Sequence, residues 1–379
     1  MNSFFRNGSL NSLPLWKISK PCCRVKLSPY PILFVAPVAW NGLRQRHQAL
    51  AQGLARRGFS LYYLNPLCGG GLAITAGSAF GRVRELTVRV PFRATGFPAL
   101  QAIAVKIAAH LLRRSGICES ETLLWVADPS MSGLSRGSWC GVVYDRCDLH
   151  GAFPGQRESA WRAYEDYLME RVDVFLATSE NLLKGFNTRS AAVRILAPNA
   201  AESDFLTTPK RFRPSPPPLL VLSAGAHFEW VDFDWLTRIS ALPGVELHLA
   251  GPGRGEGFRR LLEETGVFNH GVLSREALRR LLDTCHVGVV AFRDIPLSRA
   301  VDPIKAYEYA ARGLHVWGTD LASLRVHPMI DRVLSKTAIL PGLVEETLEL
   351  LAKPGKKQAP PTWDDRLSTI IPSIVGLME

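Results

Sequence analysis

The alternation of strand-like and helical segments is the feature that most constrains how this chain can fold. A β-rich run at 30–37, "YPILFVAP", is followed by a helical repeat at 43–58 and a second strand-like run at 59–66. The same alternation starts again at 219–226, "LLVLSAGA", and continues to "HVGVVAFR" at 286–293. Strands that alternate with helices pair in parallel and are covered on both faces. The sequence therefore predicts an α/β protein with two doubly wound, Rossmann-like domains.

A proline-rich stretch, "TTPKRFRPSPPP", separates the two alternating halves and is typical of a linker. The last segment, "WDDRLSTIIPSIVGLM", is expected to be a helix that returns across the domain boundary. The predicted organisation is a loose basic extension at 1–28, a first domain at 29–206, the linker at 207–218, a second domain at 219–354, and a connector with the returning helix at 355–379.

Composition sets the class of protein. A chain of 379 residues with 47% hydrophobic and 21% charged residues is globular and long for one core. No apolar run approaches the roughly 20 residues that span a bilayer, and the basic start lacks the pattern of a signal peptide. The seven cysteines have no metal-ligand or redox spacing, which favours reduced thiols in the cytoplasm.

The net charge of +11 lies entirely in the first part of the chain. Residues 1–150 hold 18 Lys and Arg against 6 Asp and Glu, whereas residues 151–379 hold 27 against 28. The positive electrostatic field of this half of the chain attracts an anionic partner, such as a membrane surface, a phosphorylated substrate or a nucleic acid. The alternative is a basic surface that serves only solubility.

One stretch, "VDPIKAYEYAARG", contains the start and stop signals of a helix. Asp302 suits the N-cap, Pro303 the first helical position, and Gly313 the left-handed residue past the end. This helix follows the strand-like run at 286–293, so its free N–H groups should open where ligands bind in α/β sheets.

Lys305 and Glu308 share a face of that helix near its start. A lysine there can bind a phosphate, and a carboxylate one turn further can accept hydrogen bonds from a ribose. The residues therefore predict a nucleoside diphosphate site. The alternative is a solvated salt bridge between neighbours on an ordinary helix.

The run "HVGVVAFRDIPLSRAVDPIKAYEYAARGLHVWGTD" resembles the nucleotide-binding region of GT-B glycosyltransferases, nearest to bacterial enzymes of exopolysaccharide and cell-surface glycan synthesis. Other segments resemble theirs in the same order: "APVAWNGLRQRHQALAQGLARRGFSLYYLNP", "VVYDRCDLHGAF", "VDVFLATSENLLKGF", "LSAGAHFEWVDFDWL", "LAGPG" and "TWDDRL". The resemblance implies a hexosyltransferase-type enzyme that moves a sugar from a nucleotide-sugar, with a UDP-sugar the favoured donor, to a cell-surface glycan precursor. The expected acceptor is a glycan or a polyprenyl-diphosphate-linked precursor, the latter because a basic protein at the inner membrane face would meet it there. The resemblance implies no metal and no other cofactor.

In such enzymes the second domain holds the donor and the first domain the acceptor. The resemblance places Lys305 at the diphosphate and Glu308 at the ribose. It also implies that the base lies along one loop and the phosphates face a glycine turn: Gly271, Val272 and Leu273, and Gly225 and His227. Many retaining members carry a glutamate where this chain has Ala300, and their "P-N-G" is "PNAA" here, which favours inversion. The run "DFD" at 232–234 has the Asp-x-Asp spacing of metal-dependent transferases, but it opens a helix, so capping of that helix is the preferred interpretation over metal binding.

An inverting transferase needs a general base in the first domain. Asp148 in "YDRCDLH" is the predicted base, with Asp145 and His150 as alternatives; the other reading is a pair of turn-capping aspartates. Gly42 in "WNGLRQR" is predicted to let the backbone approach the donor phosphates or the acceptor, and Arg44 and Arg46 in the same segment are predicted to meet anionic groups. His47, which falls on the apolar stripe of the same segment, is expected to be a packed core histidine.

The helical run at 97–116 has a long apolar face with basic residues toward one end. It suggests peripheral attachment to the inner face of the cytoplasmic membrane, against the alternative of an ordinary core-facing helix. Three rival functions remain: a sugar-nucleotide epimerase on the same plan, a non-catalytic nucleotide-sugar sensor, and a nucleic-acid-binding protein. Nucleic acid is not the expected partner, because the chain has no zinc spacing, aromatic stacking motif or helix-turn-helix signal.

Overall fold

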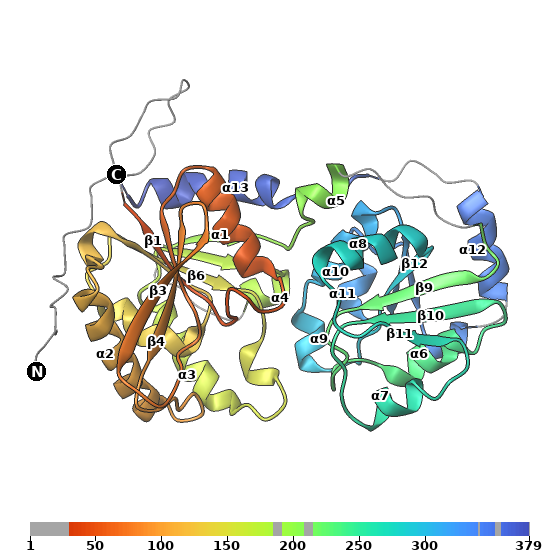
Figure 1. Cartoon of the computed structure of the whole chain (residues 1–379), viewed down its shortest axis with the longest axis horizontal. Coiled ribbons are helices and arrows are strands. Elements are labelled where there is room, and N and C mark those ends of the chain that lie inside the picture. Colours follow the sequence, from red (N-terminus) through yellow and green to blue (C-terminus); the bar gives the residue numbers. More distant parts are fainter. Residues whose placement is uncertain (1–29, 185–191, 208–214, 340–341, 353–357, 379) are drawn as a thin grey trace, which may run out of the picture.

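The computed structural model describes residues 30–184, 192–207, 215–339, 342–352 and 358–378. The described chain forms two α/β domains that lie side by side, each built on its own sheet (Figure 1). The predicted extension at 1–28 and most of the predicted linker at 207–218 lie outside the described residues.

The first sheet has, in the described chain, the strand order β3-β4-β2-β1-β5-β6-β7-β8. The strands are β1 Ile32–Val35, β2 Leu61–Leu64, β3 Ala73–Phe80, β4 Val83–Arg89, β5 Leu123–Val126, β6 Gly141–Arg146, β7 Val174–Ala177 and β8 Val193–Leu196. Neighbouring strands are parallel except β3, which forms an antiparallel hairpin with β4 that the sequence did not predict. Strand β1 is fully buried, as expected for a parallel strand covered on both faces.

Alternate residues of β1 belong to two separate cores. Leu33 and Val35 join the core beneath α2 and α3, whereas Ile32 and Phe34 join the core beneath α1. The helices of this half are α1 Arg46–Arg56, α2 Pro98–Arg114, α3 Glu158–Met169, α4 Glu180–Leu183 and α5 Ser203–Thr207, with short 3₁₀ helices η1 Glu119–Glu121, η2 Pro129–Arg136 and η3 His150–Ala152.

The second sheet is parallel throughout its described strands, in the order β11-β10-β9-β12-β13-β14. Its strands are β9 Leu219–Ala224, β10 Val245–Ala250, β11 Val267–Asn269, β12 Val287–Val290, β13 His315–Thr319 and β14 Arg332–Leu334. Its helices are α6 Phe233–Ser240, α7 Glu256–Leu261, α8 Arg275–Thr284, α9 Pro296–Ala300, α10 Ile304–Ala311, α11 Ala322–Arg325, η4 Lys336–Ala338 and α12 Gly342–Ala352. Both sheets follow the doubly wound order, in which the strand sequence reverses beside the first strand.

The last helix, α13 Trp363–Val375, returns to the first domain and packs against α1, as the sequence predicted (Figure 1). Gly53 makes this approach close, because a Cβ there would lie 2.3 Å from Leu367 Cδ1. Backbone hydrogen bonds tie the returning segment to the interdomain crossing, with Ala201 N donating to Pro361 O and Trp363 N donating to Ala201 O. The two chain crossings between the domains are thus bound to each other.

One predicted helix boundary is wrong. Helix α10 begins at Ile304, its N-cap is Pro303, and no side chain caps it, so Asp302 does not have the predicted capping role. Gly313 does take the left-handed conformation past the helix end, with φ at +75°.

Candidate functional site

A cleft of about 980 Å³ lies between the two domains, lined by residues of both. Its walls come from the segments that follow the carboxyl ends of parallel strands, including Pro37 after β1, Asp148 after β6, Gly225 after β9 and Gly251 after β10. This is the position at which doubly wound sheets bind ligands.

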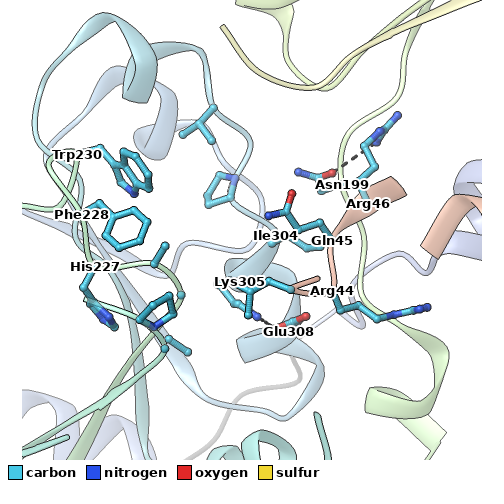
Figure 2. A pocket seen from close by; sticks show the side chains of 18 of the residues that line it. Arg44, Gln45, Arg46, Asn199, His227, Phe228, Trp230, Ile304, Lys305 and Glu308 are labelled. Carbon is cyan, nitrogen blue, oxygen red and sulfur yellow. Dashed lines mark hydrogen bonds and ion pairs between the residues drawn. The ribbon is translucent and has the colours of Figure 1, made fainter. Parts of the chain in front are cut away.

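Lys305 and Glu308 line the cleft at the start of α10. Lys305 Nζ donates to Glu308 Oε2 at 2.6 Å, and the two side chains are 24% and 6% exposed. The pair is therefore a salt bridge, as the alternative reading held, but it is mostly withdrawn from bulk water and faces a cavity (Figure 2).

Asp302 connects the start of α10 to its surroundings instead of capping it. Its carboxylate accepts hydrogen bonds from the Tyr307 hydroxyl at 3.0 Å and from the Asn199 backbone N–H, and His327 Nε2 lies 3.0 Å from it. Asn199 Nδ2 also donates to the Asp302 carbonyl at 2.6 Å. Burial, together with the Asp302 charge, raises the pKa of Tyr307. The interdomain segment at Asn199 is thereby fixed to the helix that carries Lys305.

The glycine turn after β9 approaches the turn after β10 closely. Gly225 and Gly251 have φ of +140° and +132°, and a Cβ on Gly251 would lie 1.9 Å from the Gly225 carbonyl oxygen. His227 is buried beside them, with Nε2 3.0 Å from Ser223 Oγ, and burial lowers its pKa to about 4. The imidazole is therefore neutral near pH 7, and the turn presents backbone and neutral groups to the cleft.

Only part of the loop predicted to lie along the nucleotide base lines the cleft. Val272 and Leu273 line the cleft. Gly271 is not among the cleft-lining residues, and its carbonyl accepts the Gly251 N–H at 2.7 Å. Gly271 thus joins this loop to the glycine turn.

The two candidate base residues have different surroundings. Asp145 lies in β6, has no exposed surface, and forms an ion pair with Arg46, whose Nε lies 3.1 and 3.0 Å from the two carboxylate oxygens. Asp148 follows the strand, is half-buried and lines the cleft. Burial raises the pKa of Asp148, and the charge of His150 opposes that shift. Of the two carboxylates, Asp148 is the one that a substrate in the cleft can reach.

The histidines near Asp148 are both buried. His150 stacks on Trp161, with ring centroids 5.2 Å apart, and its Nδ1 has no hydrogen-bond partner within the described chain. His47 contacts Phe34 edge to face, and burial together with Arg46 and His150 lowers its pKa to about 3. His47 is packed as the sequence predicted, although it also lines the cleft.

Gly42 and Arg44 line the cleft on the first domain. Gly42 N donates to the Ala39 carbonyl at 2.9 Å, which closes the turn that presents Arg44. Arg44 Nε donates to Glu202 Oε1 at 2.6 Å and its Nη2 donates to Gln52 at 2.7 Å. Arg44 is thus held at the cleft by two side chains.

Sequence reasoning missed several cleft-lining residues that the fold brings together. Arg275 opens α8 and pairs with Asp204 at 2.6 Å, and the rings of Phe153 and Trp230 meet across the cleft with centroids 5.7 Å apart. Phe153 stands in the quoted segment "VVYDRCDLHGAF", but no local pattern connects it to Trp230, which lies in the other domain.

Asp232 of the "DFD" run caps α6, as predicted, by accepting the Trp235 N–H at 3.1 Å. Within the described residues no group of three or more His, Cys, Asp and Glu side chains is arranged to hold a metal ion. None of the described helices combines the length and the apolar composition needed to cross a membrane.

Comparison with known proteins gives matches in structure but not in sequence. No family model matches the chain, and no curated protein sequence matches it. Among solved structures it is similar to a sucrose-phosphate synthase from Thermosynechococcus elongatus, at 15% identity and a TM-score of 0.63 over 92% of this chain and 95% of that one. It is also similar to an E. coli trehalose-6-phosphate protein bound with UDP-2-fluoro glucose, at 12% identity and a TM-score of 0.59 over 92% and 99%. A third is a UDP-forming trehalose-phosphate synthase from Burkholderia xenovorans in complex with glucose-6-phosphate, at 13% identity and a TM-score of 0.55 over 92% and 96%.

These likenesses extend over nearly the whole of each chain, so they concern the two-domain arrangement and not one domain alone. The chain has the GT-B fold, two Rossmann-like domains that face each other across a cleft, and the predicted fold class is confirmed.

Proposed function

We propose that this protein is a glycosyltransferase that moves a sugar from a nucleotide-sugar, with a UDP-sugar as the favoured donor, to a hydroxyl of a sugar acceptor. The observation that carries the proposal is the Lys305–Glu308 pair, which lies at the start of α10 in the cleft between two Rossmann-like domains. The solved neighbours support it, since one is bound with UDP-2-fluoro glucose and another is described as UDP-forming.

In the proposed donor complex, the diphosphate lies between Lys305 and the glycine turn at Gly225 and His227. Lys305 Nζ supplies a charge-assisted hydrogen bond to a phosphate oxygen, and the turn allows close approach of the backbone. Glu308 accepts hydrogen bonds from the ribose hydroxyls, and the base lies along Val272 and Leu273. Metal ions have no part in the proposal, because the leaving diphosphate is stabilised by the lysine and by the helix dipole of α10.

The proposed reaction is a single displacement at the anomeric carbon. The acceptor oxygen forms a bond to that carbon, the bond from the carbon to the phosphate oxygen breaks, and the nucleoside diphosphate leaves with the bonding electrons. Asp148 takes the proton of the acceptor hydroxyl, and its raised pKa makes it a stronger base than an ordinary aspartate. Inversion is the proposed outcome, supported by the alanine at position 300 and by a cleft-facing carboxylate on the first domain. One solved neighbour is a trehalose-6-phosphate synthase studied for transfer with retention, so the anomeric configuration of the product, read by NMR, tests this part directly.

We further propose that the acceptor is a lipid-linked precursor of a bacterial cell-surface glycan, used by a cytoplasmic enzyme attached peripherally to the inner membrane face. Helix α2 supports this, because Phe97 at its start, Leu100 and Ile103 are 56%, 48% and 47% exposed, while Lys106 and Arg114 follow on exposed positions. Apolar side chains beside basic ones suit the surface of an anionic bilayer.

Calorimetric titration of the purified protein with UDP, GDP, ADP and TDP, with and without a chelator, tests the donor site. We expect metal-independent binding of one nucleotide, weakened roughly 10- to 150-fold in Lys305→Ala, because a hydrogen bond to a charged group contributes about 1.5–3 kcal/mol. Lys336→Ala is a matched control, since Lys336 pairs with Asp232 at 3.0 Å and is not a cleft-lining residue. If none of the four nucleotides binds to the folded protein, the donor site is refuted. An epimerase would instead convert the nucleotide-sugar without consuming an acceptor.

A further inference from the structure

Three aromatic side chains from both domains meet in the cleft near the loop that carries Asp148. The ring centroids of Phe153 and Trp230 are 5.7 Å apart at 86°, and those of Phe228 and Trp230 are 5.2 Å apart at 73°. All three line the cleft and are half-buried, so part of each ring remains accessible to a ligand. Phe228 and Trp230 lie beside His227, across the pocket from Arg44 and Arg46 (Figure 2).

Two polar side-chain atoms of cleft-lining residues lack a hydrogen-bond partner in the described chain, and one of them belongs to His150, whose ring centroid lies 6.5 Å from that of Phe153. His150 Nδ1 and Ser298 Oγ are buried without a hydrogen bond in the described chain, and the two residues are only 8% and 2% exposed. They belong to η3 and α9, which pack against each other, and both residues line the cleft. An unpaired buried polar group costs about 1–3 kcal/mol, and a ligand in the cleft that hydrogen-bonds to these two atoms would offset that cost.

The charges around the cleft do not favour a phosphate at this end. The cleft-lining arginines of the described chain each already have a carboxylate partner, Arg44–Glu202, Arg46–Asp145 and Arg275–Asp204, and the cleft-lining Lys305 belongs to the proposed donor site. Arg254 lies over the Phe228 ring at 4.4 Å but pairs with Glu229 at 3.2 Å, and the cleft-lining Asp148 repels an anion when it is deprotonated.

We propose that Phe153, Trp230, His150 and Ser298 form a subsite for the acceptor, and that it takes an uncharged sugar ring and not a sugar phosphate. The C–H face of a pyranose lies against the negative face of an aromatic ring, and its hydroxyls provide hydrogen bonds to His150 Nδ1 and Ser298 Oγ. In a lipid-linked acceptor this ring is the terminal sugar, with the diphosphate farther along the molecule. The proposal rests on the transferase function, whose donor site it complements.

The assignment separates this chain from a neighbour of the same fold. The Burkholderia xenovorans structure is a complex with glucose-6-phosphate, a charged sugar. In this chain the proposed subsite has aromatic rings in its wall and the Asp148 carboxylate nearby, so it would accept a ring without a phosphate of its own.

Saturation-transfer NMR tests the proposal with defined probes: the methyl pyranosides of glucose, galactose, mannose and N-acetylglucosamine, and glucose 6-phosphate, each with the UDP-saturated protein. We expect at least one methyl pyranoside to bind more tightly than glucose 6-phosphate. Phe153→Leu keeps an apolar side chain but removes the aromatic face, and should weaken this binding roughly three- to tenfold. Phe153→Tyr should restore it, and Ser298→Ala should weaken it by a similar factor. UDP affinity should stay unchanged in Phe153→Leu.

Three results would overturn the subsite: no methyl pyranoside binds to the UDP-saturated protein, glucose 6-phosphate binds more tightly than every pyranoside, or Phe153→Leu binds the pyranosides as the unaltered protein does. Failure of the transferase proposal gives a different pattern. In that case none of UDP, GDP, ADP and TDP binds, whereas pyranoside binding that depends on Phe153 still supports the sugar subsite.

Discussion

Replacing Glu308 with alanine should weaken UDP binding and remove the preference for a nucleotide with ribose hydroxyls. The Glu308 side chain is 6% exposed and held 2.6 Å from Lys305 Nζ, so little conformational freedom is lost when it binds a ribose. A hydrogen bond to a charged acceptor contributes about 1.5–3 kcal/mol, which corresponds to a roughly 10- to 150-fold rise in Kd. Glu308→Gln retains an acceptor oxygen without the charge and should lose less UDP affinity than Glu308→Ala.

Calorimetry with UDP and 2′,3′-dideoxy-UDP separates the role of the carboxylate from a general disturbance. The unaltered protein should prefer UDP by about tenfold or more, and Glu308→Ala should bind both nucleotides with similar, weak affinity. Glu276→Ala is the control, because Glu276 lies in the first turn of α8 and forms an exposed pair with Arg280 at 3.2 Å. The reasoning is refuted if Glu308→Ala weakens both nucleotides by the same factor and the preference for UDP survives, since Glu308 would then act only through Lys305.

Three further predictions concern the first domain. Asp148→Asn should lower kcat at least about a hundredfold with donor KM little changed. In the unaltered enzyme kcat should rise with pH through the raised pKa of Asp148, because the base acts only when it is deprotonated. A flat pH profile of kcat would contradict this role. Arg46→Met should lower the free energy of unfolding of the first domain in urea by about 3–5 kcal/mol, because it leaves the Asp145 carboxylate buried without its partner. The control Arg113→Met removes an exposed pair and should lower the free energy of unfolding by less than about 1 kcal/mol. Ile103→Glu should reduce co-sedimentation with anionic vesicles roughly tenfold, and equal binding by both proteins would exclude α2 as the docking surface.

The fold was predictable because its signals are local. Buried runs such as the one at β1, followed by a helical repeat, identify a parallel sheet without knowledge of distant contacts. The hairpin of β3 and β4 was missed, since β3 is largely exposed and "AITAGSAF" lacks the apolar run that marks a buried strand. Edge strands carry a weaker pattern than central ones for this reason.

The site was predictable only in part, because its geometry depends on contacts far apart in the sequence. Local rules assigned Asp302 to a helix cap, but the backbone N–H of Asn199, more than 100 residues away, uses its carboxylate instead. The sequence favoured Asp148 over Asp145 as the base only through the resemblance, because the two aspartates share one short segment after a strand. Only the fold shows that Arg46 from α1 neutralises the first, while the second lies past the strand and faces the cleft.

The pattern of paired charges also supports the proposed division of the cleft between a charged donor and a neutral acceptor ring. Lys305 and Glu308 are three residues apart on one helix, and Lys305 is 24% exposed, so in the proposed donor complex a small rotation of the lysine would exchange its carboxylate partner for a phosphate and leave Glu308 to the ribose. Arg46 has no such freedom, because its side chain is 3% exposed and its Nη1 also donates to the Ala197 carbonyl at 2.8 Å. An anion can therefore recruit a cation from the second domain at lower cost than from Arg46. This asymmetry supports the proposal that the charged donor lies on the second domain and a neutral ring near Asp148.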